Sequence, residues 1–348
     1  MRGILATGLL GLACAVAPVR AQAPGQIVLL SYAGIFQDNY VDTVTRPWSQ
    51  SSGTGVQFFP GGTSAQMLGV LRTQKNDPQV DVVIMDTTTA AIACAEGLVE
   101  KATEAELPVL KDIHPIARQA GGDCGPGVTF DHFVMIYDTQ AMQTPPTAWS
   151  DLWNPANRGR ISLSAPPNIQ GLVLTAVLAH QATGDWRNVN STFARLRELA
   201  PLVQTFDAQP DGYTLILNNQ VTYATAWNAR SQIYRDQSQG RIGVVLPAEG
   251  TGFQINTINV VKGSKNRAAA MAFMAYALSP EAQAAFTNRM FYAPTNTRAQ
   301  PTTEALGRTA AAPENMAKVV AIDWTEMVKL RDNWNQRWRR EVIAAGSR

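Results

Sequence analysis

Polar residues and glycine recur directly after the buried, β-branched runs of this sequence. They are, in chain order, Tyr32, Gly34, Thr63, Ser64, Asp86, Thr87 and Asn168. Each loop leads into a helix-forming stretch, whose first N–H groups lack partners and carry partial positive charge. Such loops can bind a polar group of a ligand. Taken singly, Ser64 and Thr88 are more often helix N-caps, but the recurrence of the same chemistry favours a binding site.

A second candidate follows a later strand, in the segment from Ala226 to Arg230. Trp227 could stack on a ligand, and Arg230 could form two parallel hydrogen bonds with a carboxylate or a phosphate. The alternative is a buried tryptophan followed by a surface arginine at the start of a helix. The residue types leave both interpretations open.

No arrangement of residues predicts catalysis. The sequence has no G-x-S-x-G, H-E-x-x-H or G-x-x-x-x-G-K-S/T motif. Asp131 and His132 are the only suggestive pair, but neighbours in a strand point to opposite faces of the sheet. The two cysteines beyond the first 23 residues and three scattered histidines supply too few ligands for a metal site. We therefore expect no catalytic residues, no metal and no cofactor, and a secreted hydrolase is the disfavoured alternative.

The elements that position these residues alternate between strands and helices. Apolar, β-branched runs at 27–32, 56–59 and 80–85 are each followed by an amphipathic stretch, such as the helix expected at 64–73. A second series includes strands at 134–137, 160–163, 202–206, 221–225 and 242–246, and a strand expected at 257–261 returns to the first lobe. The alternation predicts a mostly parallel sheet with helices on both faces. With no flexible linker in the sequence, two α/β lobes would be joined by crossing strands that act as a hinge. Ligands bind beyond the carboxyl ends of strands in such sheets.

Length and charge narrow the class of protein. The 348 residues suit two lobes, and the formal net charge of +2 becomes zero once Arg2 and Arg20 are removed with the N-terminal segment. A neutral protein lacks the basic surface that nucleic acids require, so we expect no nucleic-acid partner. We expect a monomer.

The N-terminal 23 residues resemble an export signal, with a positive start, an apolar stretch and small residues near Ala21 and Ala23. The apolar run is too short to span a bilayer. Removal of the signal leaves Cys94 and Cys124, and the oxidising compartment outside the cytoplasm favours a disulfide between them. It would close a loop of about 30 residues and contribute about 3 kcal/mol. Two buried thiols are the alternative.

Four motifs carry a family resemblance. They are T-A-W-S-D-L-W-N-P at 147–155, followed by G-R-I at 159–161, P-A-E-G at 247–250, S-P-E-A-Q at 279–283 and Y-A-P-T-N at 292–296. In order and spacing they resemble the periplasmic spermidine/putrescine-binding proteins and their iron- and thiamine-binding cousins, over nearly the whole mature chain.

The resemblance implies an α/β fold of the type 2 periplasmic binding class, with two discontinuous lobes joined by crossing hinge strands. We expect a signal peptide at 1–23, lobe 1 at 24–131 with 257–300, lobe 2 at 132–256, and C-terminal helices at 301–348 packed on the lobes. The implied function is capture of a small polar solute in the periplasm and delivery to an ABC permease in the inner membrane.

The resemblance leaves the solute open. Where polyamine-binding members place a Trp and then an Asp after the P-x-E-G turn, this sequence has Gln254 and Asn256. An amide lacks the charge that offsets desolvation of an ammonium, and Arg230 adds positive charge. We therefore expect a neutral, zwitterionic or carboxylate-bearing ligand. A true putrescine or spermidine binder, or an iron- or thiamine-type binding protein, is the alternative.

Overall fold

The computed structural model describes residues 25–309 and 311–346, and the expected signal peptide at 1–23 lies outside the described residues. In the described part of the chain nine strands form one sheet in the order β2-β1-β3-β9-β4-β7-β5-β6, with β8 paired to β4. The strands are β1 (Gln26–Tyr32), β2 (Gly55–Gly61), β3 (Val82–Asp86), β4 (Gly127–Asp138), β5 (Ile161–Ser162), β6 (Val203–Thr205), β7 (Tyr223–Trp227), β8 (Ile242–Val245) and β9 (Phe253–Val260).

The sheet is mixed, whereas the sequence predicts a mostly parallel one. β1 is parallel to β2 and β3, and β5 is parallel to β6 and β7. The central strand β9 is antiparallel to both β3 and β4, and β4 is antiparallel to β7 and β8. The difference arises because β4 and β9 return the chain between the two halves, a role that strand–helix alternation does not reveal.

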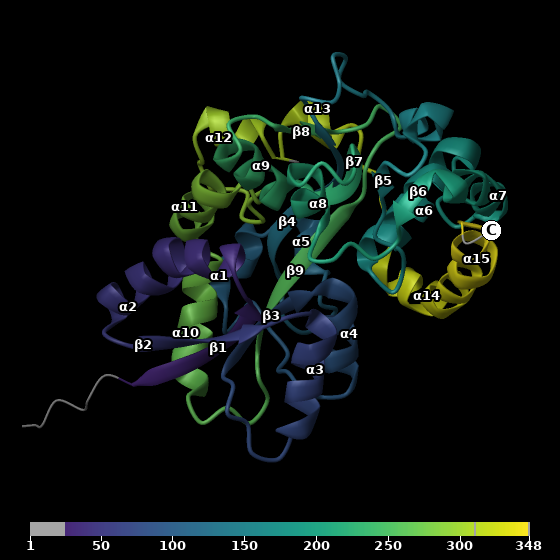
Figure 1. The fold of residues 1–348 in the computed structure, drawn as a ribbon. Helices are drawn as coiled ribbons and strands as arrows, with labels where there is room; N and C mark the ends of the chain where they lie inside the picture. Colours follow the sequence, from purple (N-terminus) through teal and green to yellow (C-terminus); the bar gives the residue numbers. More distant parts are fainter. Residues whose placement is uncertain (1–24, 310, 347–348) are drawn as a thin grey trace, which may run out of the picture.

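β4 joins the two halves of the molecule. Its first half, from Gly127 to His132, pairs with β9, and its second half, from Phe133 to Asp138, pairs with β7 and β8. β9 starts at Phe253, earlier than the strand expected at 257–261. Figure 1 shows the two lobes on either side of this crossing, with β1, β2 and β3 below and β7, β5 and β6 above.

Helices cover both faces of the lobe 1 sheet, as strand–helix alternation predicts. Along β3, Val82 and Ile84 face one apolar cluster, whereas Val83 and Met85 face another. The helices of this lobe are α1 (Ile35–Tyr40), a π-helix (Val41–Thr45), α2 (Arg46–Ser52), α3 (Ser64–Thr73), α4 (Thr87–Ala95), α5 (Pro115–Arg118), α10 (Arg267–Ala277) and α11 (Pro280–Met290), with a 3-10 turn (Pro108–Asp112). Cys94, in the last turn of α4, forms a disulfide with Cys124 in the loop before β4.

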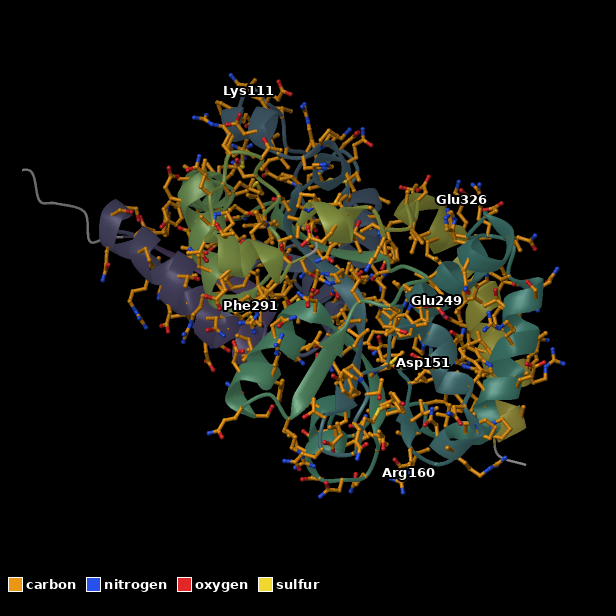
Figure 2. All side chains as sticks on the ribbon, turned by 90° about the horizontal axis from the view of Figure 1, so that it is seen from above. Lys111, Asp151, Arg160, Glu249, Phe291 and Glu326 are labelled. Carbon is orange, nitrogen blue, oxygen red and sulfur yellow. A yellow bond between two sulfur atoms is a disulfide. The ribbon has the colours of Figure 1, made fainter. Side chains whose placement is uncertain are left out.

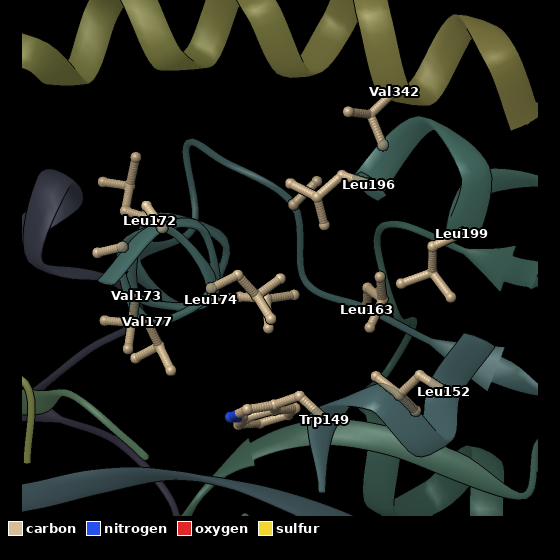
Figure 3. Packing of buried hydrophobic residues seen from close by; sticks show 14 of the residues in the cluster. Trp149, Leu152, Leu163, Leu172, Val173, Leu174, Val177, Leu196, Leu199 and Val342 are labelled. Carbon is tan, nitrogen blue, oxygen red and sulfur yellow. The ribbon is translucent and has the colours of Figure 1, made fainter. Parts of the chain in front are cut away.

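Lobe 2 is built in the same way. Phe133 and Met135 of β4 face one cluster, and Val134 and Ile136 face the other. Its helices are α6 (Ile169–Thr183), α7 (Asn190–Leu199), α8 (Gly212–Leu217) and α9 (Asn228–Gln237), with 3-10 turns at Trp149–Trp153, Pro155–Asn157 and Ala200–Leu202. Figure 3 shows Trp149 below the leucines and valines of α6 and α7.

Apart from the first, which packs on α11 of lobe 1, the C-terminal helices pack mainly on lobe 2. They are α12 (Thr303–Gly307), α13 (Pro313–Met316), α14 (Trp324–Arg337), a π-helix (Trp338–Ile343) and α15 (Ala344–Gly346). The buried indole of Trp338 donates to Thr175 Oγ1 of α6 at 2.8 Å, and Val342 joins the same cluster. The N-terminal end of α14 contacts α4 of lobe 1. No helix among the described residues is both long and apolar enough to cross a membrane.

The four family motifs hold the fold together in two places. The Glu249 carboxylate accepts hydrogen bonds from the backbone N–H groups of Trp149 and Ser150 at 2.7 and 2.9 Å, and the Trp149 indole donates to the Gly250 carbonyl. Figure 2 shows Glu249 beside Asp151 of the first motif. In lobe 1 the buried Gln283 side chain accepts from the Thr295 N–H at 2.8 Å. These contacts of the motifs therefore stabilise the fold.

Candidate functional site

Four predicted site residues meet where β1, β3 and β9 approach the start of α3. The Tyr32 hydroxyl lies 2.8 Å from Ser64 Oγ and donates to Asn256 Oδ1 at 3.0 Å. Ser64 Oγ in turn accepts the Asp86 backbone N–H at 3.0 Å. Since the phenol donates to Asn256, the serine hydroxyl must donate to the phenol. Burial raises the pKa of Tyr32 well above its ordinary value, so the phenol stays neutral.

The amide of Asn256 is the centre of this network. Its oxygen also accepts Gln254 Nε2 at 3.2 Å, and its Nδ2 donates to Thr129 Oγ1 at 3.0 Å. Asn256 is buried. An aspartate here would carry its charge into the same enclosed position. Asn256 therefore places a neutral amide, and no charge, next to Tyr32.

Three other predicted residues cap helices. Thr63 accepts the Gln66 N–H within a capping box at the start of α3, Asp86 accepts the Thr89 N–H at the start of α4, and Asn168 accepts the Gln170 N–H at the start of α6. The N-cap of α3 is therefore Thr63, one residue before the expected Ser64. The N-cap of α4 is Asp86, two residues before the expected Thr88.

The remaining residues at the lobe 1 strand ends have local roles. Both Asp86 oxygens are occupied by hydroxyls, Oδ1 by Thr88 and Oδ2 by Thr89. The Thr87 hydroxyl donates to the Ala120 carbonyl. Gly34 precedes α1 with a φ of 70°, a conformation that glycine adopts without strain. The side chains of Asp86 and Thr87 and the backbone of Gly34 thus stabilise these loops, and contact of the three residues with a ligand stays a prediction.

In lobe 2, Trp227 ends β7 and Arg230 lies in the first turn of α9. The Trp227 ring packs edge-on against Phe133 at 5.7 Å, and its carbonyl accepts the Ser231 hydroxyl at 2.7 Å. The Ala229 N–H donates to Asp131 Oδ1 at 3.0 Å, which ties α9 to the crossing strand β4. The residues on both sides of Arg230 are thus fixed by hydrogen bonds.

The side chain of Arg230, unlike those neighbouring residues, is not held by hydrogen bonds within the described part of the chain. The side chain is half-buried, and among the described residues it has no hydrogen bond and no ion pair. Burial lowers its pKa, but nearby Tyr213, Tyr292 and Asp211 more than offset this, so the pKa lies above its ordinary value. A permanently charged, planar donor without a partner is well suited to receive a carboxylate.

Asp131 and His132 lie at the middle of β4, and both are buried. Asp131 Oδ1 accepts the N–H groups of His132 and Ala229, but its Oδ2 has no partner in the described part of the chain, and neither has His132 Nδ1. Burial raises the pKa of Asp131 to about 8 and lowers that of His132 to about 3. The imidazole and the carboxylate do not form a dyad.

Asp131 and Tyr292 were not predicted as site residues. The charge of Arg230 acts to lower the pKa of Asp131 and of Tyr292, and Tyr292 acts to raise the pKa of Arg230. Both residues therefore lie near Arg230. The sequence held two signals: the Asp131-His132 pair, considered only for catalysis, and the Y-A-P-T-N motif that contains Tyr292. Among the described residues, no group of three or more metal-ligating side chains comes together.

The family model of the bacterial extracellular solute-binding proteins matches residues 48–317. The chain belongs to this family. Its fold class is the two-lobed one that the sequence predicts, since a crystal structure of an ABC transporter substrate-binding protein from Bradyrhizobium japonicum matches 90% of this chain and 99% of its own, with 19% identity and a TM-score of 0.78. The predicted role, a solute-binding protein and not an enzyme, is confirmed at the level of the family.

Two curated relatives resemble the chain along most of their length. The γ-aminobutyric acid-binding protein of Pseudomonas aeruginosa is 26% identical over 332 residues, which are 90% of each chain. The spermidine/putrescine-binding periplasmic protein of Escherichia coli is 21% identical over 306 residues, 86% of this chain and 83% of its own. The likeness to polyamine-binding proteins that the motifs suggested is therefore confirmed.

Proposed function

We propose that this solute-binding protein captures a carboxylate-bearing solute, with zwitterionic amino acids included, and that it is the substrate-binding component of an ABC importer. The observation that carries the proposal is the Arg230 guanidinium, which is half-buried and has no partner among the described residues. A bound carboxylate would supply the missing charge and accept two parallel hydrogen bonds from it.

The same residues disfavour a polyamine. A di- or triammonium ligand would bring further positive charge next to Arg230, and the buried Asn256 offers an amide where polyamine-binding members carry a carboxylate. Leaving a charged group desolvated without a partner costs several kcal/mol, on the order of the whole binding energy of a weak ligand.

The similarity to the relatives also favours a carboxylate-bearing solute over a polyamine. The γ-aminobutyric acid-binding relative is more similar to the chain, at 26% identity, than the polyamine-binding relatives at 20–21%. γ-Aminobutyric acid carries the carboxylate that Arg230 would bind. It is therefore the first probe to use.

The binding step that we propose is hinge closure. Tyr32 and Ser64 belong to lobe 1, Asn256 lies on the crossing strand β9, and Trp227 and Arg230 belong to lobe 2. In the described part of the chain, β4 and β9 cross directly between the two lobes. A ligand that contacts both sets has higher affinity for the closed form and shifts the population towards it. In this proposal the lobes comprise residues 24–131 with 257–300 and residues 132–256, with the C-terminal helices at 301–348.

The proposal also covers the compartment in which the protein acts and its membrane partner. The export signal, cleaved near Ala21 or Ala23, would place a monomeric protein in the periplasm, where an inner-membrane permease would recognise the closed form. The names of the relatives support this setting, since they describe periplasmic binding proteins and an ABC transporter component.

A thermal-shift screen tests the ligand class. The mature protein would be heated with γ-aminobutyric acid, other amino acids, dicarboxylates and sugar acids, and in parallel with putrescine and spermidine. Saturation at 100 times the Kd should stabilise the protein by about 2.7 kcal/mol. We expect a shift with at least one acid and none with the polyamines. A shift with spermidine and with no acid would contradict the proposal.

A further inference from the structure

Arg308 lies on the segment that follows α12 and connects lobe 1 to the C-terminal helices. α12 packs along α11 of lobe 1, and α9 of lobe 2 lies next to both (Figure 1). The Arg308 side chain is mostly buried, with 18% of it exposed. A mostly buried cation requires hydrogen-bond or charge partners. The partners of Arg308 show which elements of the fold it connects.

Most of its partners belong to one face of α9. Arg308 Nε donates to Gln232 Oε1 at 3.0 Å, and its Nη2 donates to the Gln232 carbonyl at 3.2 Å and to Asp236 Oδ1 at 2.8 Å. The Arg308 carbonyl accepts Asn228 Nδ2 at 2.7 Å, and Gln232 Nε2 donates to Asn228 Oδ1 at 2.9 Å. Residues four apart lie on one side of a helix, so this network holds that side of α9 from its first residue onward.

The guanidinium also contacts lobe 1. It lies over the ring of Phe291, 3.9 Å from the centroid, in cation–π geometry. Phe291, labelled in Figure 2, ends α11 in the left-handed conformation with a φ of 58°. The next residue is Tyr292, whose phenol acts electrostatically on Arg230. Arg308 therefore contacts both elements that surround Arg230: the first turns of α9 and the loop that carries Tyr292.

Arg308 and Arg230 differ in the partners that their guanidinium groups have. Arg308 has an ion pair with Asp236 and several hydrogen bonds, whereas Arg230, on the same helix that Arg308 holds, has no partner among the described residues. A planar guanidinium recognises a carboxylate only when its position and orientation are fixed, because misplacement loses one of the two parallel hydrogen bonds.

We propose that Arg308 is a positioning residue for the binding site: it fixes the first turns of α9 against the end of α11 and so sets the position of Arg230 relative to Tyr292. The effect on ligand affinity rests on the proposed function, but the effect on α9 does not. The alternative is that Arg308 only stabilises the protein as a whole.

Hydrogen exchange of the ligand-free protein tests the positioning directly. We compare Arg308→Ala and Arg308→Lys with a matched control, Arg298→Ala. Arg298 lies ten residues earlier in the same connecting segment, and its ion pair among the described residues is with Asp112 of lobe 1 at 3.4 Å; its side chain is 70% exposed. We expect Arg308→Ala to speed hydrogen exchange of the backbone amides of residues 229–233 by about tenfold, which is the effect expected when one interaction between packed elements is lost. The lysine variant, which keeps the charge near Asp236 but not the planar contacts, should give a smaller increase. Unchanged exchange in α9, or an equal increase across both lobes, would contradict the proposal.

A double-mutant cycle connects the positioning to binding. The probe is γ-aminobutyric acid, and Kd is measured by calorimetry well below the melting temperature. We expect Arg308→Ala to raise the Kd of the wild-type protein several-fold but to have no further effect in an Arg230→Ala background, because it acts through Arg230. Equal losses in both backgrounds would contradict it. If the wild-type protein does not bind this probe, the choice of solute fails, and the exchange measurement still decides the role of Arg308.

Discussion

The buried Asp131 makes a specific prediction about stability and pH. Its native pKa is about 8, raised from an ordinary value of 3.8 by burial. A carboxyl group whose pKa is raised on folding binds a proton more tightly in the native state. Its contribution to stability is therefore complete below the unfolded pKa and is lost as the pH rises through the native one.

The magnitude follows from the two pKa values. Between pH 6.5 and pH 8.5 the native carboxyl loses its proton while the unfolded one is already ionised, which removes about 2 kcal/mol from the free energy of unfolding. His132, with a native pKa of about 3, is neutral in the native state throughout this range. Its unfolded imidazole is about half protonated at pH 6.5, which adds about 0.4 kcal/mol in the opposite direction, and this contribution cancels between the wild type and an Asp131→Asn variant. For a chain of this size the entropy of unfolding is about 0.7 kcal/mol/K, so the melting temperature falls by about 3 °C.

The assay is thermal or urea unfolding of the wild type and Asp131→Asn at pH 6.5, 7.5 and 8.5. Asparagine keeps the oxygen that accepts the Ala229 and His132 N–H groups, and it does not titrate. The difference between the two proteins cancels every other titrating group. We expect the variant to gain about 2 kcal/mol relative to the wild type between pH 6.5 and 8.5.

A second aspartate on β4 provides the control. Asp138 is also buried, but it pairs with Arg241 at 3.2 Å. Asp138→Asn breaks this pair and should destabilise the protein without a gain at alkaline pH. If the difference between wild type and Asp131→Asn is flat from pH 6.5 to 8.5, Asp131 is ionised in the native state and the reasoning is wrong.

Two further predictions concern the disulfide and the buried amide. Replacing Cys94 and Cys124 by serine opens a loop with a sequence separation of 30 and should cost about 3–4 kcal/mol, measured as the midpoint of urea unfolding against the oxidised wild type; an equal midpoint would refute the entropic estimate. Asn256→Asp places a carboxylate where the Tyr32 hydroxyl and Gln254 donate. Desolvation should make this variant about 1–3 kcal/mol less stable at pH 7 than at pH 5, in a comparison with the wild type, and a pH-independent difference would show that the position tolerates charge.

The sequence predicts the local elements well because their signals are local. Helix α3 has the bounds expected from its pattern, and the strands at 27–32 and 80–85 lie within two residues of β1 and β3. The expected strand at 221–225 starts two residues late, at Tyr223. The caps differ by one or two residues because hydroxyls and carboxylates at successive positions are equally able to accept the same N–H groups.

The contacts of the site are less accessible to sequence reasoning. Tyr32 and Asn256 are 224 residues apart, and Arg308 contacts Gln232 from 76 residues away. No periodicity or motif encodes such pairs, since they arise only when the crossing strands bring the lobes together. Arg230 could be proposed from its residue type and place after a strand, but its lack of a partner among the described residues became evident only in the structure.

The most direct test of the account compares two ligands of almost equal length by calorimetry. γ-Aminobutyric acid carries a carboxylate at one end, and putrescine carries an ammonium group there instead. We predict that the wild-type protein binds the acid at least about 30-fold more tightly, and that Arg230→Ala loses most of this preference, since removal of one partner from a buried charge pair costs 2 kcal/mol or more. Tighter binding of putrescine by the wild type, or an unchanged preference in Arg230→Ala, would contradict the assignment of Arg230 as the carboxylate-binding residue.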